Sequence, residues 1–198
     1  MKGTRNLTLL IVLGLVLILG VWGCSGYNGV VKQDENVKNT WANVQSTYQR
    51  RADLIPNLVN TVKGEADFEQ KTLIQTIEAR YKNLNSVKID PANLTTENIA
   101  KFQQAQGELS SALSRLMVVV ENYPNLKTNE GFRNLQAQLE GTENRINVAR
   151  NDFNRAVNTY NTKVRSFPMN LLAGMFGFKV KEGFKAEEGA DKAPEVKF

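Results

Sequence analysis

The chain of 198 residues carries 25 basic and 20 acidic residues, one cysteine and no histidine, and its formal net charge is +5. A single cysteine excludes an intrachain disulfide, and without histidine the chain lacks the side chain that most often serves as general base or metal ligand. No basic block or aromatic-basic motif stands out, so the composition predicts neither nucleic-acid binding nor a cofactor.

The N-terminal segment, residues 1–26, is predicted to be a membrane anchor or a signal. Lys2 and Arg5 precede a stretch without charge that extends to residue 31, and residues 7–22 are almost wholly apolar. Those residues would form about 24 Å of helix, which is short for a bilayer core of about 30 Å. The basic N-terminus favours an exported body, on the far side of the membrane from that end.

Two kinds of anchor are compatible with this segment. In the first, a retained membrane helix continues through Cys24 to about residue 31, with Trp22 and Tyr27 at the membrane interface. In the second, residues 21–24 form a lipobox-like site, cleavage occurs before Cys24, and that cysteine carries a lipid. Trp22 is large for a position where small residues are usual, and both alternatives stay open.

Residues 27–180 are predicted to form an all-α body. A first stripe of apolar residues recurs at the spacing of one helix face: Val30, Val37, Trp41, Val44, Tyr48, Ala52 and Ile55. Further stripes run from Phe68 to Leu84, from Ile99 to Tyr123 and from Phe132 to Phe167. Short connections predict an antiparallel up-down four-helix bundle whose first and fourth helices are long, at roughly 40–55 Å each.

Polar residues predict where the later helices begin and where the chain turns. Thr95 or Thr96 is expected to cap the third helix, and Thr128 or Asn129 the fourth. Prolines at positions 91, 124 and 168 predict the loops, because proline disfavours helix in the residue before it.

Residues 50–64, RRADLIPNLVNTVKG, contain a proline within the first predicted helix. Pro56 cannot donate to the carbonyl of Ala52, so the helix is expected to bend or restart, with an arginine as donor to the freed carbonyl. Helical geometry places Arg51 at the edge of the apolar stripe. In this interpretation the polar residues serve only to form hydrogen bonds with the backbone groups that the bend leaves free.

A second interpretation makes the outer face of the same helix a docking patch. Arg50, Asp53 and Asn57 fall opposite the apolar stripe, and Leu54 lies at their flank. Such a patch could bind a partner protein or the chain's own apolar segment 170–178, which has no helical stripe of its own.

The C-terminal tail, residues 181–198, is charged and is expected to be loose. It ends on Val196, a spacer residue and Phe198. PDZ-type clefts of other envelope proteins bind C-terminal segments of this pattern, which add a strand to the sheet of the PDZ domain. In the alternative, Val196 and Phe198 lie against the bundle together with Phe184, as a short extended strap.

Several stretches together resemble the LemA family of bacterial membrane-anchored helical proteins. They are Tyr27-Asn28, RRADLIPNLV at residues 50–59, YPNLK at residues 123–127, LEGTENRI at residues 139–146, and the segment from Phe167-Pro168 to Phe178. The resemblance covers nearly the whole chain and implies a membrane-tethered antiparallel helical bundle. It implies no catalytic activity.

Three classes of function are compatible with these features. The first is a membrane-tethered, non-catalytic scaffold or adaptor that acts through contacts with other envelope proteins. The second is a binder of an envelope ligand such as peptidoglycan or a lipid headgroup. The third is a hydrolase that uses Glu140 and Glu143 as a carboxylate pair, although an ion pair with Arg145 or solvation of an exposed helix face accounts for the same residues more simply. No phosphate loop or nucleophile motif supports catalysis.

Overall fold

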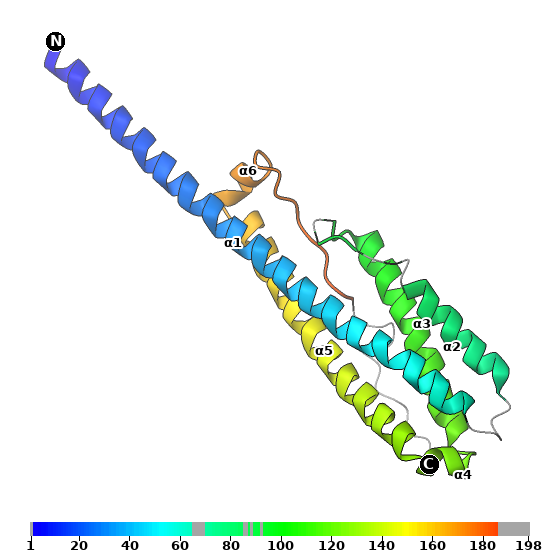
Figure 1. The fold of residues 1–198 in the computed structure, drawn as a ribbon. Coiled ribbons are helices and arrows are strands. Elements are labelled where there is room, and N and C mark those ends of the chain that lie inside the picture. The colour runs from blue at the N-terminus through cyan, green and yellow to red at the C-terminus, as the bar shows by residue number, and fades with distance from the viewer. Residues whose placement is uncertain (1, 65–69, 85–86, 88, 92, 186–198) are drawn as a thin grey trace, which may run out of the picture.

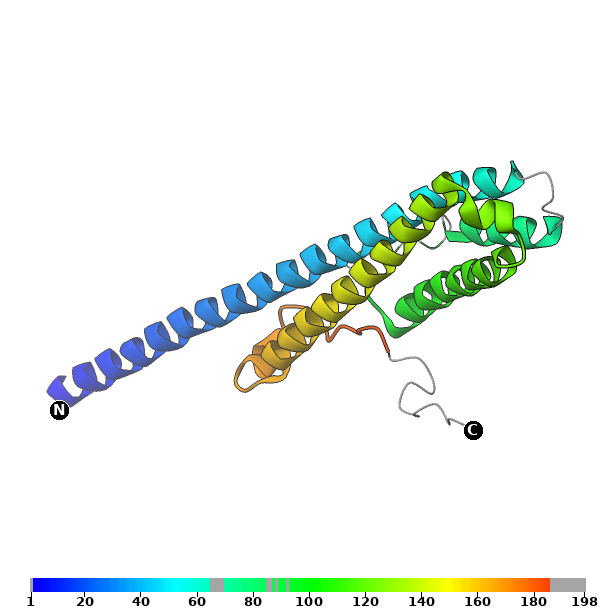
Figure 2. The ribbon, with the colours of Figure 1, turned by 90° about the horizontal axis from the view of Figure 1, so that it is seen from below.

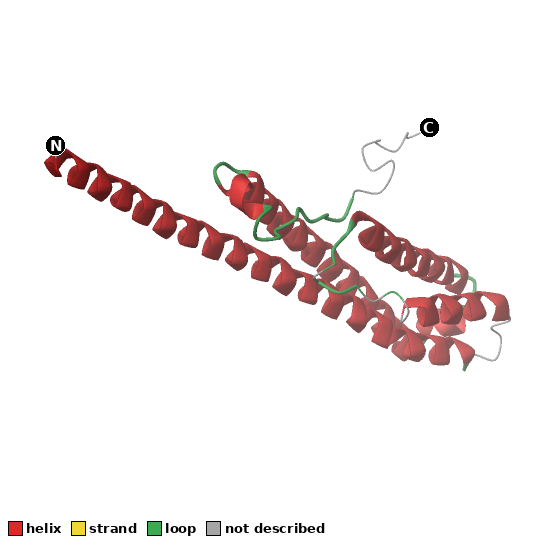
Figure 3. Cartoon of the chain, turned by 90° about the horizontal axis from the view of Figure 1, so that it is seen from above, coloured by secondary structure: helices red, strands yellow, loops and turns green. Residues whose placement is uncertain are grey.

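The computed structural model describes residues 2–64, 70–84, 87, 89–91 and 93–185, and over these residues it contains helices and no strands (Figures 1 and 3). The predicted all-α class is therefore confirmed. The helices are α1 (Lys2–Lys63), α2 (Lys71–Leu84), α3 (Thr96–Val120), α4 (Pro124–Thr128), α5 (Glu130–Arg165) and α6 (Met169–Ala173).

Helix α1 joins the apolar N-terminal segment and the first stripe into one element of 62 residues. At about 1.5 Å per residue it is about 93 Å long, and its N-terminal part extends beyond the rest of the molecule (Figures 1 and 2). Pro56 lies inside α1 and is exposed, and the helix does not restart there. Within the described part of the chain, no helix has both the length and the apolar character needed to cross a membrane.

The predicted caps of the two later long helices are confirmed. Thr95 accepts a hydrogen bond from the backbone N–H of Asn98 at the start of α3, and Asn129 accepts one of 3.0 Å from the N–H of Phe132 at the start of α5. These side chains satisfy backbone donors that the first turn of a helix leaves free.

Two hydrophobic cores hold the body together. The distal core, far from the N-terminal part of α1, contains residues of α1, α2, α3, α4 and α5: Ile55, Leu58, Val59, Val62, Ile74, Ile77, Leu109, Ala112, Leu113, Leu116, Val120, Leu126, Phe132 and Leu139. The proximal core is built around α1 and α5, and its residues include Val30, Val37, Trp41, Val44, Tyr48, Phe102, Ile146, Phe153, Val157, Tyr160, Val164, Met169 and Phe184. All seven residues of the first predicted stripe are buried.

The predicted four-helix bundle is not confirmed as the arrangement of the whole body. Helices α1 and α5 pack along each other, while α2 and α3 pack as a pair (Figure 1). The four long helices share only the distal core. In the proximal core the early part of α3, the loop residues Ile89 and Leu94, α6 and Phe184 cover α1 and α5. Phe167, expected as the last residue of the fourth stripe, is exposed instead.

Candidate functional site

The predicted docking patch lies on the outer face of α1. Arg50, Asp53 and Asn57 are exposed, and Leu54 is partly buried against the distal core. Asp53 accepts a hydrogen bond of 2.7 Å from the Gln49 side chain, one turn earlier in the helix. These positions agree with the outer-face assignment, and the role of the patch in binding stays a prediction.

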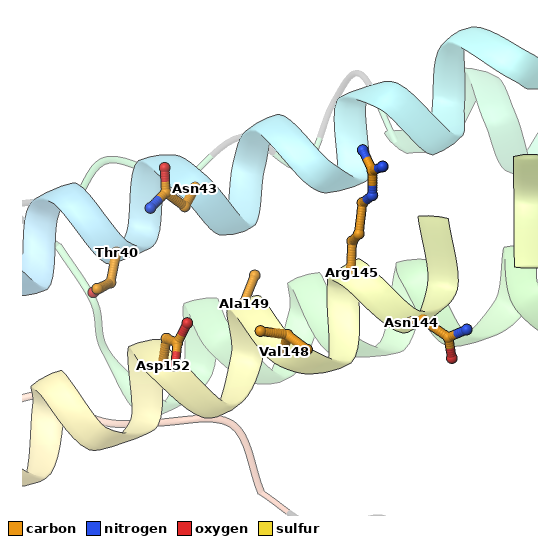
Figure 4. A pocket seen from close by; sticks show the side chains of 7 residues that line it. All are labelled: Thr40, Asn43, Asn144, Arg145, Val148, Ala149 and Asp152. Atoms are coloured by element: carbon orange, nitrogen blue, oxygen red, sulfur yellow. The ribbon is translucent and has the colours of Figure 1, made fainter. Parts of the chain in front are cut away.

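A shallow groove of about 390 Å³ continues this face between α1 and α5 (Figure 4). From α1 it is lined by Thr40 and Asn43, and from α5 by Asn144, Arg145, Val148, Ala149 and Asp152. Residues 43, 50 and 57 are seven apart, so they lie within about 40° of one another around the helix. We call the α1 residues Thr40, Asn43, Arg50, Leu54 and Asn57 the α1 strip.

Arg51, beside the α1 strip, points into the body. Its side chain is only 3% exposed, and its guanidinium donates to Glu143 on α5 at 2.9 Å and to Ser110 on α3 at 2.7 Å. A further bond of 2.5 Å joins it to the side-chain oxygen of Gln106. Arg51 is therefore not the arginine that could donate to the Ala52 carbonyl, because the stripe-edge position directs its side chain between helices. The guanidinium instead joins α1, α3 and α5.

An aromatic ring and carboxylates complete the surroundings of Arg51. Its guanidinium lies over the ring of Tyr48, 5.1 Å from the centroid, and burial raises the pKa of the Tyr48 phenol. Glu143, one member of the carboxylate pair considered for a hydrolase, is paired with Arg51 and not with Arg145. Glu140 accepts a bond from Gln136. Among the described residues, no group of three or more acidic or cysteine side chains could hold a metal ion.

An extended strap, residues 179–185, runs along the proximal core and is held by two asparagines of α5. The side-chain oxygen of Asn161 accepts from the backbone N–H of Lys181 at 2.9 Å, and its amide donates to the carbonyl of the same residue at 2.7 Å. Asn154 binds both backbone groups of Phe184 in the same way, at 2.8 and 3.1 Å. Each asparagine thus replaces a strand partner for one residue of the strap.

The spacing of these asparagines matches the strap. Seven helical residues rise about 10.5 Å, and three extended residues span about 10 Å, so Asn161 and Asn154 meet residues 181 and 184 in register. Gly183, between the two clamped residues, lies against α5, because a Cβ there would be 2.6 Å from Oδ1 of Asn154. We call Asn154 and Asn161 the asparagine clamp.

Phe184 fixes one end of the strap inside the proximal core. Its ring is 7% exposed and lies between the rings of Trp41, Phe102 and Phe153, at centroid distances of 5.9, 6.3 and 5.6 Å. Arg150 covers it, with its guanidinium carbon 4.8 Å from the ring centroid. Three elements, α1, α3 and α5, therefore contribute to the pocket that binds this one side chain.

Charged groups fix the other end. Lys181 forms an ion pair of 3.1 Å with Asp34 on α1, and both side chains are mostly buried. Burial alone would raise the pKa of Asp34, but hydrogen bonds from Lys38 and Lys181 lower it below its ordinary value. Tyr160 donates to the Lys179 carbonyl at 2.9 Å, and burial, followed by the charge of Asp34, raises its pKa to about 12.

These contacts correct the boundary of the loose tail, because residues 181–185 are docked on the body. Val196 and Phe198, the candidate ligand of a PDZ-type cleft, lie outside the described residues. Cys24, the candidate lipidation site, is exposed within α1. The asparagine clamp was not predicted from the sequence. Asparagine is a poor helix former, so two asparagines seven residues apart on the inner face of a helix could have indicated that they bind another segment.

An elongated all-α protein with a projecting apolar helix is the class that this architecture defines. The LemA family profile matches residues 40–198, and the chain belongs to this family. It is 29% identical over 181 residues to magnetosome protein MamQ 2 of Paramagnetospirillum magneticum, covering 83% of this chain and 66% of the relative. MamQ of Magnetospirillum gryphiswaldense is 28% identical with the same coverage.

A third relative carries the family name. Protein LemA of Metamycoplasma hominis is 21% identical over 148 residues, which cover 74% of this chain and 63% of the relative. The chain thus spans slightly less than two thirds of the length of the curated relatives it matches.

Proposed function

We propose that the protein is a membrane-tethered, non-catalytic helical scaffold or adaptor of the bacterial cell envelope, which acts through protein–protein contacts. Membership of the LemA family, whose profile matches residues 40–198, supports the helical body. The relatives MamQ 1 and MamQ 2 are magnetosome proteins by name.

The observation that carries the adaptor proposal is the α1 strip with its groove. Arg50, Asn43 and Asn57 present donors and acceptors along one line, and on α5 Val148 is 59% exposed beside Arg145 and Asp152. An open groove between two long helices, apolar at its floor and charged at its rim, is suited to a helix or an extended segment of another protein.

The tether is proposed to be the N-terminal part of α1. As a retained helix, residues 7–22 would stay in the bilayer. In the lipoprotein alternative, cleavage before Cys24 would remove them, and a lipid on Cys24 would hold the body at the membrane. Lys2 and Arg5 would stay on the cytoplasmic side, and the body would stand on the exported side as an antiparallel bundle. Replacing Cys24 by alanine distinguishes the anchors, because only a lipoprotein would accumulate as unprocessed precursor.

Site-specific photocrosslinking in intact cells tests the adaptor proposal. A photoreactive residue at Asn43 or Asn57 is expected to crosslink the same partner, and one at Ser111, exposed on α3, is the matched control. Arg50→Ala should reduce the crosslinked product while the melting temperature barely changes. Equal yields from all three positions, or an Arg50→Ala chain that loses stability and not the partner, would contradict the proposal.

A further inference from the structure

Helix α6 and the turns on both sides of it carry most of the exposed large apolar side chains of the body. Beyond residue 30, the described chain exposes seven such side chains, and five of them belong to residues 167–180. They are Phe167, Leu171, Met175, Phe176 and Val180, and we call them the α6 platform. Apolar side chains gathered in this way on the surface of one short segment indicate a binding surface.

The α6 platform is fixed to α1 at the point where the apolar N-terminal segment ends. The Tyr27 ring contacts the rings of Phe176 and Phe178, at centroid distances of 5.1 and 5.5 Å. Gly26 lets α6 pack closely, because a Cβ there would be 3.1 Å from the sulfur of Met169. Figure 2 shows α6 at the end of α5, beside the part of α1 that projects from the body.

The sequence on both sides of the α6 platform is basic, and of these basic residues Lys181 is paired with Asp34 of α1. Residues 1–33 and 153–181 contain no acidic residue, and their basic residues are Lys2, Arg5, Lys32, Arg155, Lys163, Arg165, Lys179 and Lys181. Lys163, Arg165 and Lys179 are exposed and flank the α6 platform in the chain. An apolar surface with a basic rim is the combination by which interfacial segments bind anionic lipid headgroups.

We propose that the α6 platform is a second membrane contact, which lies in the headgroup layer of an anionic bilayer. This inference rests on the proposed tether, because α1 entering the bilayer at about residue 22 brings α6 to its surface. Leu171, Met175 and Phe176 insert, at a depth of about 5–10 Å, while Lys163, Arg165 and Lys179 bind lipid phosphates. The body is then held at two points.

Fluorescence quenching by brominated lipids tests this arrangement in the full-length chain. With Cys24 replaced by serine, an environment-sensitive probe is attached to a single cysteine at Met175, or at Val118 as the exposed control on α3. In phosphatidylcholine–phosphatidylglycerol vesicles, the probe at residue 175 is expected to lose most of its emission, and the probe at residue 118 to keep it.

The possible outcomes separate the two proposals. If the chain remains with the vesicles but the probe at residue 175 is quenched no more than the one at 118, the α6 contact is overturned and the tether stands. A different result is a probe at residue 175 that is shielded in detergent as well and is insensitive to brominated lipid. That result would mean that another protein or a second copy covers the α6 platform, and it would also overturn the α6 contact. A chain that stays in solution overturns both.

Charge variants test the choice of anionic lipid. Changing Lys163, Arg165 and Lys179 to glutamine should restore much of the emission at residue 175 on anionic vesicles. The matched control changes Lys71, Lys82 and Arg115, which are exposed on α2 and α3, and should leave the quenching as it was. Equal effects of the two triple variants would contradict the role assigned to the basic rim.

Discussion

The two cores of the body bury similar side chains but are closed by different means. Around the distal core, α2 and α3 complete a set of four long helices, and helical side chains fill every side. Along the proximal core α1 and α5 continue without α2, and a strap lies where a helix would otherwise pack. A helix satisfies its own backbone, whereas an extended strap must find partners for its N–H and C=O groups.

That difference explains why asparagines, and not only apolar residues, are needed on the buried face of α5. A side-chain amide is both donor and acceptor, so one asparagine satisfies both backbone groups of one strap residue. The strap that covers the proximal core is therefore held by directional hydrogen bonds and the Phe184 ring, whereas the distal core is covered by packed helices. Substitutions in the strap and at the border between the cores show whether the two cores also differ in stability.

The largest effect is expected from Phe184→Ala. Removing a buried ring that contacts three others should cost about 3 kcal/mol of unfolding free energy, since a cavity remains between α1, α3 and α5. Trp41 should become more exposed, which its fluorescence reports in a chain where Trp22 is replaced by phenylalanine. Lys185→Ala, one residue later and exposed, is the control and should change little.

The same variant measures how independent the cores are. Hydrogen exchange of the α2 amides, which belong to the distal core, should be unchanged in Phe184→Ala if the strap region opens locally. Equal loss of protection in α2 and in the strap would mean that both cores unfold as one unit, and the distinction drawn between them would fail.

A smaller effect is expected from Glu143→Ala, at the border between the cores. The substitution leaves the buried Arg51 guanidinium without its counter-charge, and because Glu143 is itself 47% exposed the cost should be about 1–3 kcal/mol. Glu140→Ala, on the same helix and exposed, should cost less than about 0.5 kcal/mol. Denaturant unfolding of both variants measures these costs. Equal stabilities would show that the Arg51 ion pair does not stabilise the packing of α1, α3 and α5.

Each residue of the asparagine clamp should contribute slightly less to the free energy of unfolding than Glu143 does. Asn161→Ala leaves two backbone groups of Lys181 without partners, but the strap is near solvent, so we expect about 1–2 kcal/mol. Exchange of the Lys181 amide should accelerate, while that of Phe184, held by Asn154, should change less. Asn158→Ala, exposed on α5, is the control. Slower or unchanged exchange at Lys181 would show that the clamp is not what protects it.

Sequence reasoning recovered the elements with strong periodicity and missed those that depend on contacts between distant segments. The stripe from Val30 to Ile55 and the caps at Thr95 and Asn129 are local patterns, and the structure contains them. The burial of Arg51 depends on where Glu143 and Gln106 arrive from other helices, which no local pattern fixes. The strap has no periodicity of its own, since its conformation is set by α5.

The smallest expected effect comes from the ion pair at the first clamped residue. Asp34→Asn removes the charge that binds Lys181, and because Lys38 is more exposed and Asp34 retains some solvent, the cost at neutral pH should be below about 1 kcal/mol. The folded pKa of Asp34 lies below its ordinary value of 3.8. Its contribution is therefore fully present above that value and is lost as the pH falls through the folded pKa.

The pH dependence gives this prediction its control. The stability difference between Asp34→Asn and the unchanged chain should shrink toward zero well below pH 3.8, because both then carry a neutral side chain at this position. Asp152→Asn, exposed on α5 and paired with the exposed Arg155, should show a smaller difference at every pH. A difference for Asp34→Asn that persists in acid would assign the effect to the shape of the side chain and not to its charge. The proximal core would then be closed by hydrogen bonds and packing alone.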